Sequence, residues 1–223
     1  MRSARRADQA PERGVRTNLF CKMNSPVVVF DLGKVLVDFD YSIAARKVAA
    51  RSSKSPSNLV SLLAASPLIN QYECGLVTRQ AFFETIRDTI GYKGDLAEFG
   101  GYFADIFTEI PAMTTLHADL RRCSLPTYIL SNTNDLAVEH IERNFPFFKD
   151  FDGYIFSFKV RAMKPDARIY EAMEAMCGRT GAGIVYLDDR LENVAAGAAR
   201  GWRAVLHQTP ELSREALAGF GLI

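Results

Sequence analysis

Acidic and polar side chains follow three short apolar runs that lie far apart in the sequence. These side chains are Asp31 after the run 27–30, Ser131 and Asn132 after 127–130, and Asp188 and Asp189 after 184–187. Short runs rich in β-branched and aromatic residues are typical of strands that are buried on both faces of a sheet. Since open parallel sheets bind ligands at the carboxyl ends of their strands, we expect these side chains to meet at one sheet edge.

These residue types suit phosphoryl transfer. Carboxylates at two strand ends can hold a hard cation such as Mg²⁺, which prefers oxygen ligands. A hydroxyl, an amide and main-chain N–H groups at a helix start can bind a phosphate, and Lys164 can place a positive charge on it. Together they would offset the charge that develops on a transferring phosphoryl group. Asp31 would be the nucleophile, because an aspartate can carry a phosphoryl group as an aspartyl-phosphate.

The elements that must position these residues alternate along the second half of the chain. The expected strands are 27–30, 127–130, 153–158, 184–187 and 203–207, and the expected helices of this part are 114–123, 135–143, 165–176, 192–200 and one started by Thr209 and Pro210. Short strands joined by helices predict right-handed βαβ units. The predicted fold is therefore α/β, a Rossmann-like parallel sheet with helices on both faces.

A long stretch after the first strand has no strand-like run and shows helical patterns instead. Its expected helices are 57–65, 78–90 and 95–107. Thr78 is the expected N-cap of the middle one. A stretch of this length is too long for a loop inside a compact domain, so we predict a helical cap inserted after the first strand. The predicted units are a leader at 1–24, a core at 25–40 and 111–223, and a cap at 41–110.

Length and composition suit one domain with an insertion, since the chain has 223 residues, 48% of them hydrophobic and 24% charged. The net charge of +1 argues against a general nucleic-acid binder, and no apolar segment reaches membrane-spanning length. The cysteines lie far apart without a C-x-x-C pair, which predicts neither a zinc site nor disulfides and favours a reducing cytoplasm. They are Cys21, Cys74, Cys123 and Cys177.

The first 24 residues are basic, with six basic and two acidic side chains, which leaves 21 basic and 24 acidic residues in the rest of the chain. They contain no apolar h-region, so they do not resemble a secretory signal. We expect a disordered leader, or a start placed too early with Met23 as the alternative initiator. A transit peptide or an anion-binding arm is the remaining alternative.

Four segments together resemble the motifs of the haloacid dehalogenase superfamily of Asp-nucleophile phosphatases. They are FDLGKVLVD at 30–38, LSNT at 130–133, MKPDARIY at 163–170 and LDDRLENVAAGAARGW at 187–202. Their order and spacing fit the superfamily over about residues 26–210, and the insertion is similar to the helical cap of its first cap class. Within the superfamily, the chain most resembles the branch with bacterial alpha-D-glucose-1-phosphate phosphatases and the phosphatase domain of soluble epoxide hydrolases.

The resemblance implies a role for each residue that matches a motif position. Asp31 matches the nucleophile and a Mg²⁺ ligand, Gly33 a backbone-carbonyl metal ligand, Ser131 and Asn132 the phosphate binders, Lys164 the lysine that contacts phosphate and nucleophile, Asp189 a direct metal ligand, and Asp188 a residue acting on the metal through water. The implied reaction is Mg²⁺-dependent hydrolysis of a small-molecule phosphate ester, with no nucleic-acid or membrane partner. A monomer and a homodimer both remain open.

Gly33 departs from the pattern of most phosphatases of this superfamily, which have a second aspartate at that position. That aspartate protonates the leaving group and later activates water, a contribution of roughly 10²–10⁴ in rate. The glucose-1-phosphatase-like branch also carries glycine here, and sugar 1-phosphates or acyl phosphates would need the missing acid least. Lys34 is a second departure, and it could replace the acid or face solvent.

Three function classes follow from these residues. The first is a Mg²⁺-dependent phosphatase of a small phosphorylated metabolite, and the second is a phosphate-binding protein without useful turnover, which Gly33 would allow. The third is a haloacid dehalogenase, which uses the same aspartate on carbon without a metal and would gain nothing from the extra carboxylates at 188 and 189. Tyr72 and Glu73 could contact a substrate from the cap, whereas the three isolated histidines are expected to be structural.

Overall fold

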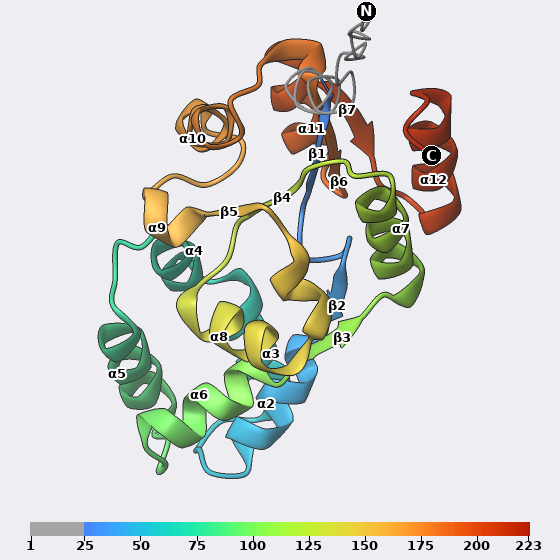
Figure 1. The fold of residues 1–223 in the computed structure, drawn as a ribbon. Coiled ribbons are helices and arrows are strands. Elements are labelled where there is room, and N and C mark those ends of the chain that lie inside the picture. Colours follow the sequence, from blue (N-terminus) through green and yellow to red (C-terminus); the bar gives the residue numbers. More distant parts are fainter. Residues whose placement is uncertain (1–24) are drawn as a thin grey trace, which may run out of the picture.

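A computed structural model of the chain describes residues 25–223 (Figure 1). Its main sheet has five parallel strands in the order β5-β4-β1-β6-β7, so β1 lies in the middle. The strands are β1 (Val27–Phe30), β4 (Thr127–Ser131), β5 (Gly153–Phe156), β6 (Ile184–Asp188) and β7 (Arg203–Leu206). Phe30 at the end of β1 is in register with Ile129 and Leu187. The predicted α/β fold is confirmed.

Helices cover both faces of this sheet. They are α7 (Pro111–Arg122), α8 (Asp135–Asn144), α9 (Ser157–Val160), α10 (Ala167–Cys177), α11 (Leu191–Ala199) and α12 (Pro210–Gly219), with short 3₁₀ helices at Pro146–Asp150 and Gly181–Gly183. On one face, Val28 and Phe30 pack in a cluster with α7, α8 and α12. On the other, Val27 and Val29 pack in a cluster with α10. Successive strand residues point to opposite faces, which explains why all four residues of β1 are apolar.

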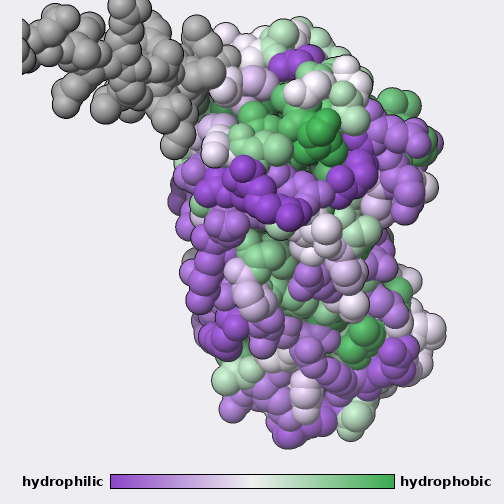
Figure 2. Space-filling model, turned by 45° about the vertical axis from the view of Figure 1, so that its right-hand side comes forward, coloured by the Kyte–Doolittle hydropathy of each residue, from purple (hydrophilic) through white to green (hydrophobic). Residues whose placement is uncertain are grey.

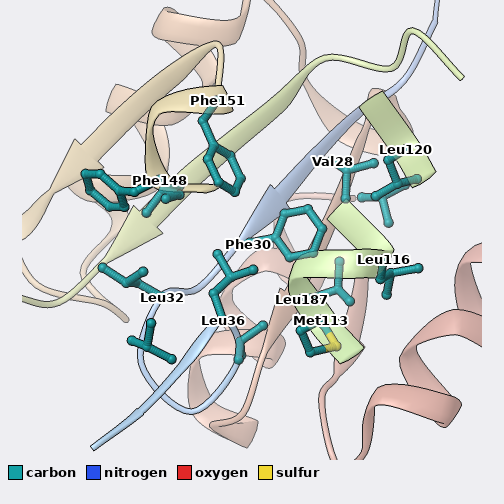
Figure 3. Close-up of a cluster of buried hydrophobic side chains, with 14 of the residues drawn as sticks. Val28, Phe30, Leu32, Leu36, Met113, Leu116, Leu120, Phe148, Phe151 and Leu187 are labelled. Carbon is teal, nitrogen blue, oxygen red and sulfur yellow. The ribbon is translucent and has the colours of Figure 1, made fainter. Parts of the chain in front are cut away.

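The first of these clusters anchors the loop that follows β1. Figure 3 shows Val28, Phe30 and Leu187 from the strands packed with side chains of α7 and with Phe148 and Phe151. Leu32 and Leu36 belong to the same cluster, with exposed fractions of 1% and 0%. Because both leucines are buried, the loop between them is held against the core at the carboxyl end of β1.

A helical unit is inserted between two short strands, β2 (Val37–Phe39) and β3 (Phe107–Glu109), which pair antiparallel. Its helices are α2 (Tyr41–Ala49), α3 (Pro56–Ala65), α4 (Pro67–Glu73), α5 (Arg79–Ile90) and α6 (Leu96–Ala104). They form an apolar cluster of their own, centred on Phe82, Phe99 and Phe103. The predicted N-cap of α5 is confirmed, because the Thr78 side chain accepts a hydrogen bond from the Ala81 N–H.

Two expected elements end at least two residues earlier than the sequence indicated. The helix expected at 95–107 ends at Ala104, because Phe107 pairs with Phe39 in the β2–β3 hairpin, where their ring centroids lie 6.1 Å apart. The apolar spacing of a helix continues into this strand and hides the change. The strand expected at 153–158 ends at Phe156, where the short helix α9 begins.

The surface near α12 combines polar and apolar areas. Figure 2 shows the side on which α12 lies, which is mostly hydrophilic with a hydrophobic area in its upper part. Leu212, Phe220 and Ile223 near this end of the chain are exposed apolar residues. Within 25–223, no helix is long and apolar enough to span a bilayer. The cysteines of this range are free thiols, and the leader predicted at 1–24 lies outside it.

Candidate active site

Three carboxylates meet at the carboxyl edge of the sheet. Oxygen atoms of Asp31, Asp188 and Asp189 all lie within 4.8 Å of one another. Asp31 follows β1 and Asp188 ends β6, and the two strands are neighbours, with the Asp31 N–H donating to the Leu187 carbonyl at 2.8 Å. The convergence that the sequence predicted for residues 157 positions apart therefore occurs, because parallel strands end at a common edge.

Lys164 is buried between two of these carboxylates. Its Nζ lies 2.9 Å from Asp31 Oδ1 and 2.6 Å from Asp188 Oδ2, and it donates to the Leu130 carbonyl at 2.9 Å. All three ammonium protons are thereby used. Burial alone would lower the pKa of Lys164, but the two carboxylates raise it above its ordinary value. The side chain is therefore a fixed positive charge beside Asp31.

Asn132 holds the main chain of Lys164 in place. Its Oδ1 accepts the Lys164 N–H at 2.7 Å, and its Nδ2 donates to the Lys164 carbonyl at 3.0 Å. The side-chain amide that was predicted to bind phosphate is thus engaged in positioning the lysine. The Ser131 hydroxyl is less engaged: among residues 25–223 it makes one hydrogen bond, to the Asn132 carbonyl at 3.4 Å, and Ser131 lines a small cavity at the site.

Asp188 and Asp189 have different surroundings. Asp188 is fully buried, and its carboxylate accepts hydrogen bonds from Lys164, the Tyr186 hydroxyl, the Arg190 N–H and the Asn193 side chain. Asp189 is half-buried, lines the cavity and accepts no hydrogen bond from any other residue in the described part of the chain. Asp189 is therefore open to a ligand, while Asp188 positions the residues around it.

Negative charge exceeds positive charge in this cluster. Burial raises the pKa of Asp31 to about 7, against the effect of Lys164 and with a further rise from Asp188. Burial also raises the pKa of Asp189, and Asp188 adds to the rise. Burial would raise the pKa of Asp188 as well, but Lys164 holds it below its ordinary value. One ammonium thus faces three carboxylates, and a further cation would stabilise all of them.

The donor set fits a hard divalent cation. The available ligand atoms are carboxylate and carbonyl oxygens, which Mg²⁺ prefers. Asn193 supplies a further observation: its Nδ2 donates to Asp188 at 2.9 Å, but its Oδ1, in a residue only 1% exposed, has no hydrogen-bond partner among residues 25–223. A buried acceptor without a partner is costly. A hydrated cation at this cluster would supply donors for it.

Gly33 packs against an aromatic ring in the wall of the site. A Cβ atom added to Gly33 would lie 3.0 Å from Cε1 of Phe39, so a side chain here would require that ring to move by a few tenths of an ångström. Lys34 covers the same ring, with its Nζ 4.6 Å from the ring centroid, and it donates to Asp38 and to the Phe39 carbonyl. Lys34 lies in the cavity wall but is tied to the β2 strand.

A cavity of about 250 Å³ opens between this cluster and the helical insertion. The core side of its wall includes Asp31, Gly33, Lys34, Asn132, Met163, Lys164, Asp189, Arg190 and Asn193, and the other side includes Phe39, Tyr41, Ile69, Asn70 and Glu73. A smaller cavity of about 60 Å³ shares Gly33, Phe39, Tyr41, Glu73 and Asn132 with it. The volume is below the ~300–1,000 Å³ that is typical of pockets for drug-sized ligands, so it suits a small metabolite.

The sequence suggested Tyr72 and Glu73 as substrate contacts from the cap, and only one of them lies at the cavity. Glu73 lines the cavity, whereas the Tyr72 ring stacks on Phe82 with centroids 4.4 Å apart and its hydroxyl donates to Asp135. Tyr41, Asn70 and Arg190 were not predicted. Arg190 directly follows the acidic pair and could have been recognised from that position, while the other two carry no sequence signal.

The chain was compared with known families and structures. A model of the family "haloacid dehalogenase-like hydrolase" matches residues 26–201. The HAD family enzyme BT-2542 from Bacteroides thetaiotaomicron, in complex with magnesium and inorganic phosphate, is 22% identical with a TM-score of 0.73, over 82% of this chain and 93% of that chain. A predicted HAD-like hydrolase from Porphyromonas gingivalis is 22% identical with a TM-score of 0.72, over 86% and 98%.

A dehalogenase has a similar fold. L-2-haloacid dehalogenase from Xanthobacter autotrophicus is 22% identical, with a TM-score of 0.61, over 87% of this chain and 83% of that chain. These likenesses extend over both the sheet and the helical insertion, and at such identities they concern the fold.

Proposed function

The chain belongs to the haloacid dehalogenase-like hydrolases, and from this premise we propose that it is a Mg²⁺-dependent phosphatase of a small phosphorylated metabolite. One observation carries the proposal. Asp31 and Asp188 both form ion pairs with the buried ammonium of Lys164, and the open carboxylate of Asp189 lies beside them. A phosphatase site needs a nucleophile, a fixed positive charge and an oxygen-rich cation site within a few ångströms, and this edge of the sheet holds groups of all three kinds.

In the proposed reaction, the Asp31 carboxylate attacks phosphorus and carries the phosphoryl group as an aspartyl-phosphate, which water then hydrolyses. Lys164 holds its positive charge beside the nucleophile, and Asn132 keeps the lysine in place. The Ser131 hydroxyl donates to a phosphoryl oxygen. Asp31, Asp189 and the Gly33 carbonyl, with Asp188 behind them, would hold Mg²⁺, whose charge would offset that of the phosphoryl group.

Two further observations support this assignment. BT-2542, which has a similar fold, has been seen with magnesium and inorganic phosphate. The cavity of about 250 Å³ limits the substrate to a small molecule. We further propose that residues 41–110 act as the cap that selects this substrate, because they supply Tyr41, Asn70 and Glu73 to its wall.

The branch of the family remains part of the proposal. Gly33 matches the alpha-D-glucose-1-phosphate phosphatase branch, and the contact of Gly33 with Phe39 gives the glycine a physical reason, since an aspartate would displace the ring. Sugar 1-phosphates are the substrates to test first, because their anomeric leaving group needs protonation least.

The test is a panel of phosphate esters assayed for phosphate release with Mg²⁺ and with a chelator. We expect hydrolysis that requires Mg²⁺ and is abolished in Asp31→Asn. Asp38→Asn is the matched control, because Asp38 is an exposed aspartate that lines neither cavity. Activity that persisted in Asp31→Asn would exclude this nucleophile. Binding of phosphate without hydrolysis of any ester would favour the phosphate-binding alternative.

A haloacid dehalogenase is the second candidate, because the fold is also similar to L-2-haloacid dehalogenase. The carboxylates of Asp188 and Asp189 beside Asp31 argue against it, since they would repel an anionic haloacid in a site without a metal. Release of halide from a haloacid, at a rate that a chelator does not change, would support the dehalogenase instead.

A further inference from the structure

Glu73 is the acidic side chain that the cap brings to the site. It is the last residue of α4 and lines both cavities, each of which also contains Gly33 and Asn132 in its wall. Within the described range, no other acidic residue of the helical insertion lines either cavity. Its carboxylate accepts no hydrogen bond from another residue in 25–223, so it is available to a substrate.

The main chain of Glu73 is fixed to the core. Its carbonyl accepts a hydrogen bond from the Ser157 hydroxyl at 2.6 Å, and that same hydroxyl oxygen accepts the Thr133 N–H at 2.9 Å. Ser157 is fully buried, and Thr133 follows the predicted phosphate-binding residues. Gly75 adds a close approach, because its φ is +66° and a Cβ there would lie 2.2 Å from the carbonyl oxygen of residue 158. The end of α4 is therefore attached to the core beside the residues that follow β4.

A second attachment holds the same end of α4. The Tyr72 hydroxyl donates to Asp135 at the start of α8, and Arg79 Nε donates to the other oxygen of Asp135 at 2.8 Å. Glu73 thus lies between two contacts that join cap and core. The main chain that carries its carboxylate is therefore held in place beside the cavity, as expected of a residue that acts on a bound substrate.

The surroundings of Glu73 allow it to exchange a proton near neutral pH. Burial raises its pKa to about 7, and Arg190 acts in the opposite direction. The Tyr41 hydroxyl of α2 is close enough for the Glu73 charge to raise its pKa. The other charged or titratable groups in the walls of the two cavities are Asp31, Lys34, Lys164 and Asp189. A group of this kind has both its protonated and its ionised form available at neutral pH.

The other candidates for proton transfer at the cavity have other tasks. Lys34 is tied to Asp38 and to the Phe39 carbonyl, and Gly33 has no side chain. We propose, on the basis of the phosphatase function above, that Glu73 is the acid–base residue of this site and performs from the cap the task that an aspartate at position 33 would perform from the core.

In the proposed cycle, Glu73 gives up one proton and takes one back. As the bond between phosphorus and the ester oxygen breaks and Asp31 bonds to phosphorus, the Glu73 carboxyl gives its proton to that oxygen and the alcohol leaves. The resulting Glu73 carboxylate then accepts a proton from the water that attacks the aspartyl-phosphate. Inorganic phosphate is released, Asp31 is restored and Glu73 is protonated again.

The test compares two esters in the full-length chain with Mg²⁺. Glycerol phosphate has an alcohol leaving group that needs a proton, whereas the phenolate of dinitrophenyl phosphate leaves without one. We expect Glu73→Gln to lower kcat/KM by roughly 10²–10⁴ for glycerol phosphate and by less than about tenfold for dinitrophenyl phosphate. Glu84→Gln, an exposed glutamate of the same cap, should change neither, and Glu73→Asp should recover part of the loss.

Other results would overturn either the role of Glu73 or the phosphatase function. An equal loss for both esters in Glu73→Gln, or a selective loss in Lys34→Met instead, would overturn the proposal while leaving the phosphatase function intact. Hydrolysis that does not depend on Mg²⁺, or that persists in Asp31→Asn, would overturn the proposed phosphatase function itself. If Glu73→Gln does not fold, the wild-type pH profile decides: kcat/KM should fall above about pH 7 for glycerol phosphate only, and identical profiles for both esters would refute the proposal.

Discussion

Replacing Asp31 by asparagine should stabilise the metal-free protein at alkaline pH while abolishing its activity. Burial raises the pKa of Asp31 to about 7 in the folded protein, whereas an unfolded aspartate has a pKa of about 3.9. A carboxyl whose folded pKa is raised contributes stability below the unfolded pKa, and this contribution is lost as the pH rises through the folded pKa. At 1.36 kcal/mol per pKa unit, ionised Asp31 costs at most roughly 4 kcal/mol above pH 7.

Asparagine avoids this cost but binds Lys164 less well. The amide oxygen of asparagine still accepts a hydrogen bond from the Lys164 ammonium, but it lacks the attraction between two opposite charges. The Lys164 ammonium keeps its contacts with Asp188 and the Leu130 carbonyl in the variant. We therefore expect Asp31→Asn to raise the free energy of unfolding by about 2 kcal/mol at pH 8 and to have little effect at pH 4.

Urea unfolding with a chelator, followed from pH 4 to pH 8 for both proteins, measures this difference. Saturating Mg²⁺ should reverse the order at pH 8, because a ligand at a hundred times its Kd adds about 2.7 kcal/mol to the protein that binds it, and the variant lacks one of the proposed ligands. A variant that is less stable than the wild type at pH 8 without metal would refute the account. So would a stability difference that does not change with pH.

Three further substitutions test residues of the site and of the core. Asn132→Ala removes both hydrogen bonds to the main chain of Lys164, so we expect a loss of about 2 kcal/mol in urea unfolding and a fall in kcat larger than any rise in KM. Burial lowers the pKa of His117 to about 4 in the folded protein, against about 6.5 in the unfolded chain. Neutral His117 therefore stabilises the fold above about pH 6.5, and up to roughly 3 kcal/mol of the free energy of unfolding is lost as the pH falls to 4. His117→Gln should flatten that part of the stability profile. Gly33→Ala should cost about 1 kcal/mol through the contact of its Cβ with Phe39, and a double-mutant cycle should show this cost disappearing beside Phe39→Leu.

The parts of the fold that the sequence predicted are those in which one short segment contains its own signal. The run 27–30 is wholly apolar because both faces of β1 are covered, and Asp31, Ser131 and Asp188 stand where such runs end. Thr78 was recognised as an N-cap because its partner is only three residues away. Signals of this kind need no knowledge of the rest of the chain.

The missed features depend on partners that are distant in the sequence. Asn132 was predicted to bind phosphate, but the sequence does not show that its side chain also holds the main chain of Lys164, 32 residues later. The sequence equally presents Gly33 as a missing aspartate, without showing that Phe39 fills the space of a side chain. Phe107 continued a helical spacing and proved to be in a strand, because its pairing with Phe39 outweighed the local pattern.

The proposed phosphatase could dispense with an acid on the loop after β1, and the arrangement of the site explains why. That loop is held by Leu32 and Leu36 in the core and closed from above by Phe39, so its shape is set by packing rather than by a catalytic side chain. The opposite wall of the cavity belongs to the cap, whose α4 is attached to the core at both Ser157 and Asp135. With the cap held in this way, a proton donor placed on it is as well positioned as one on the core. Such a donor would also contact the leaving group, which is the part of a phosphate ester that differs between substrates, so proton transfer and substrate selection could reside in one element.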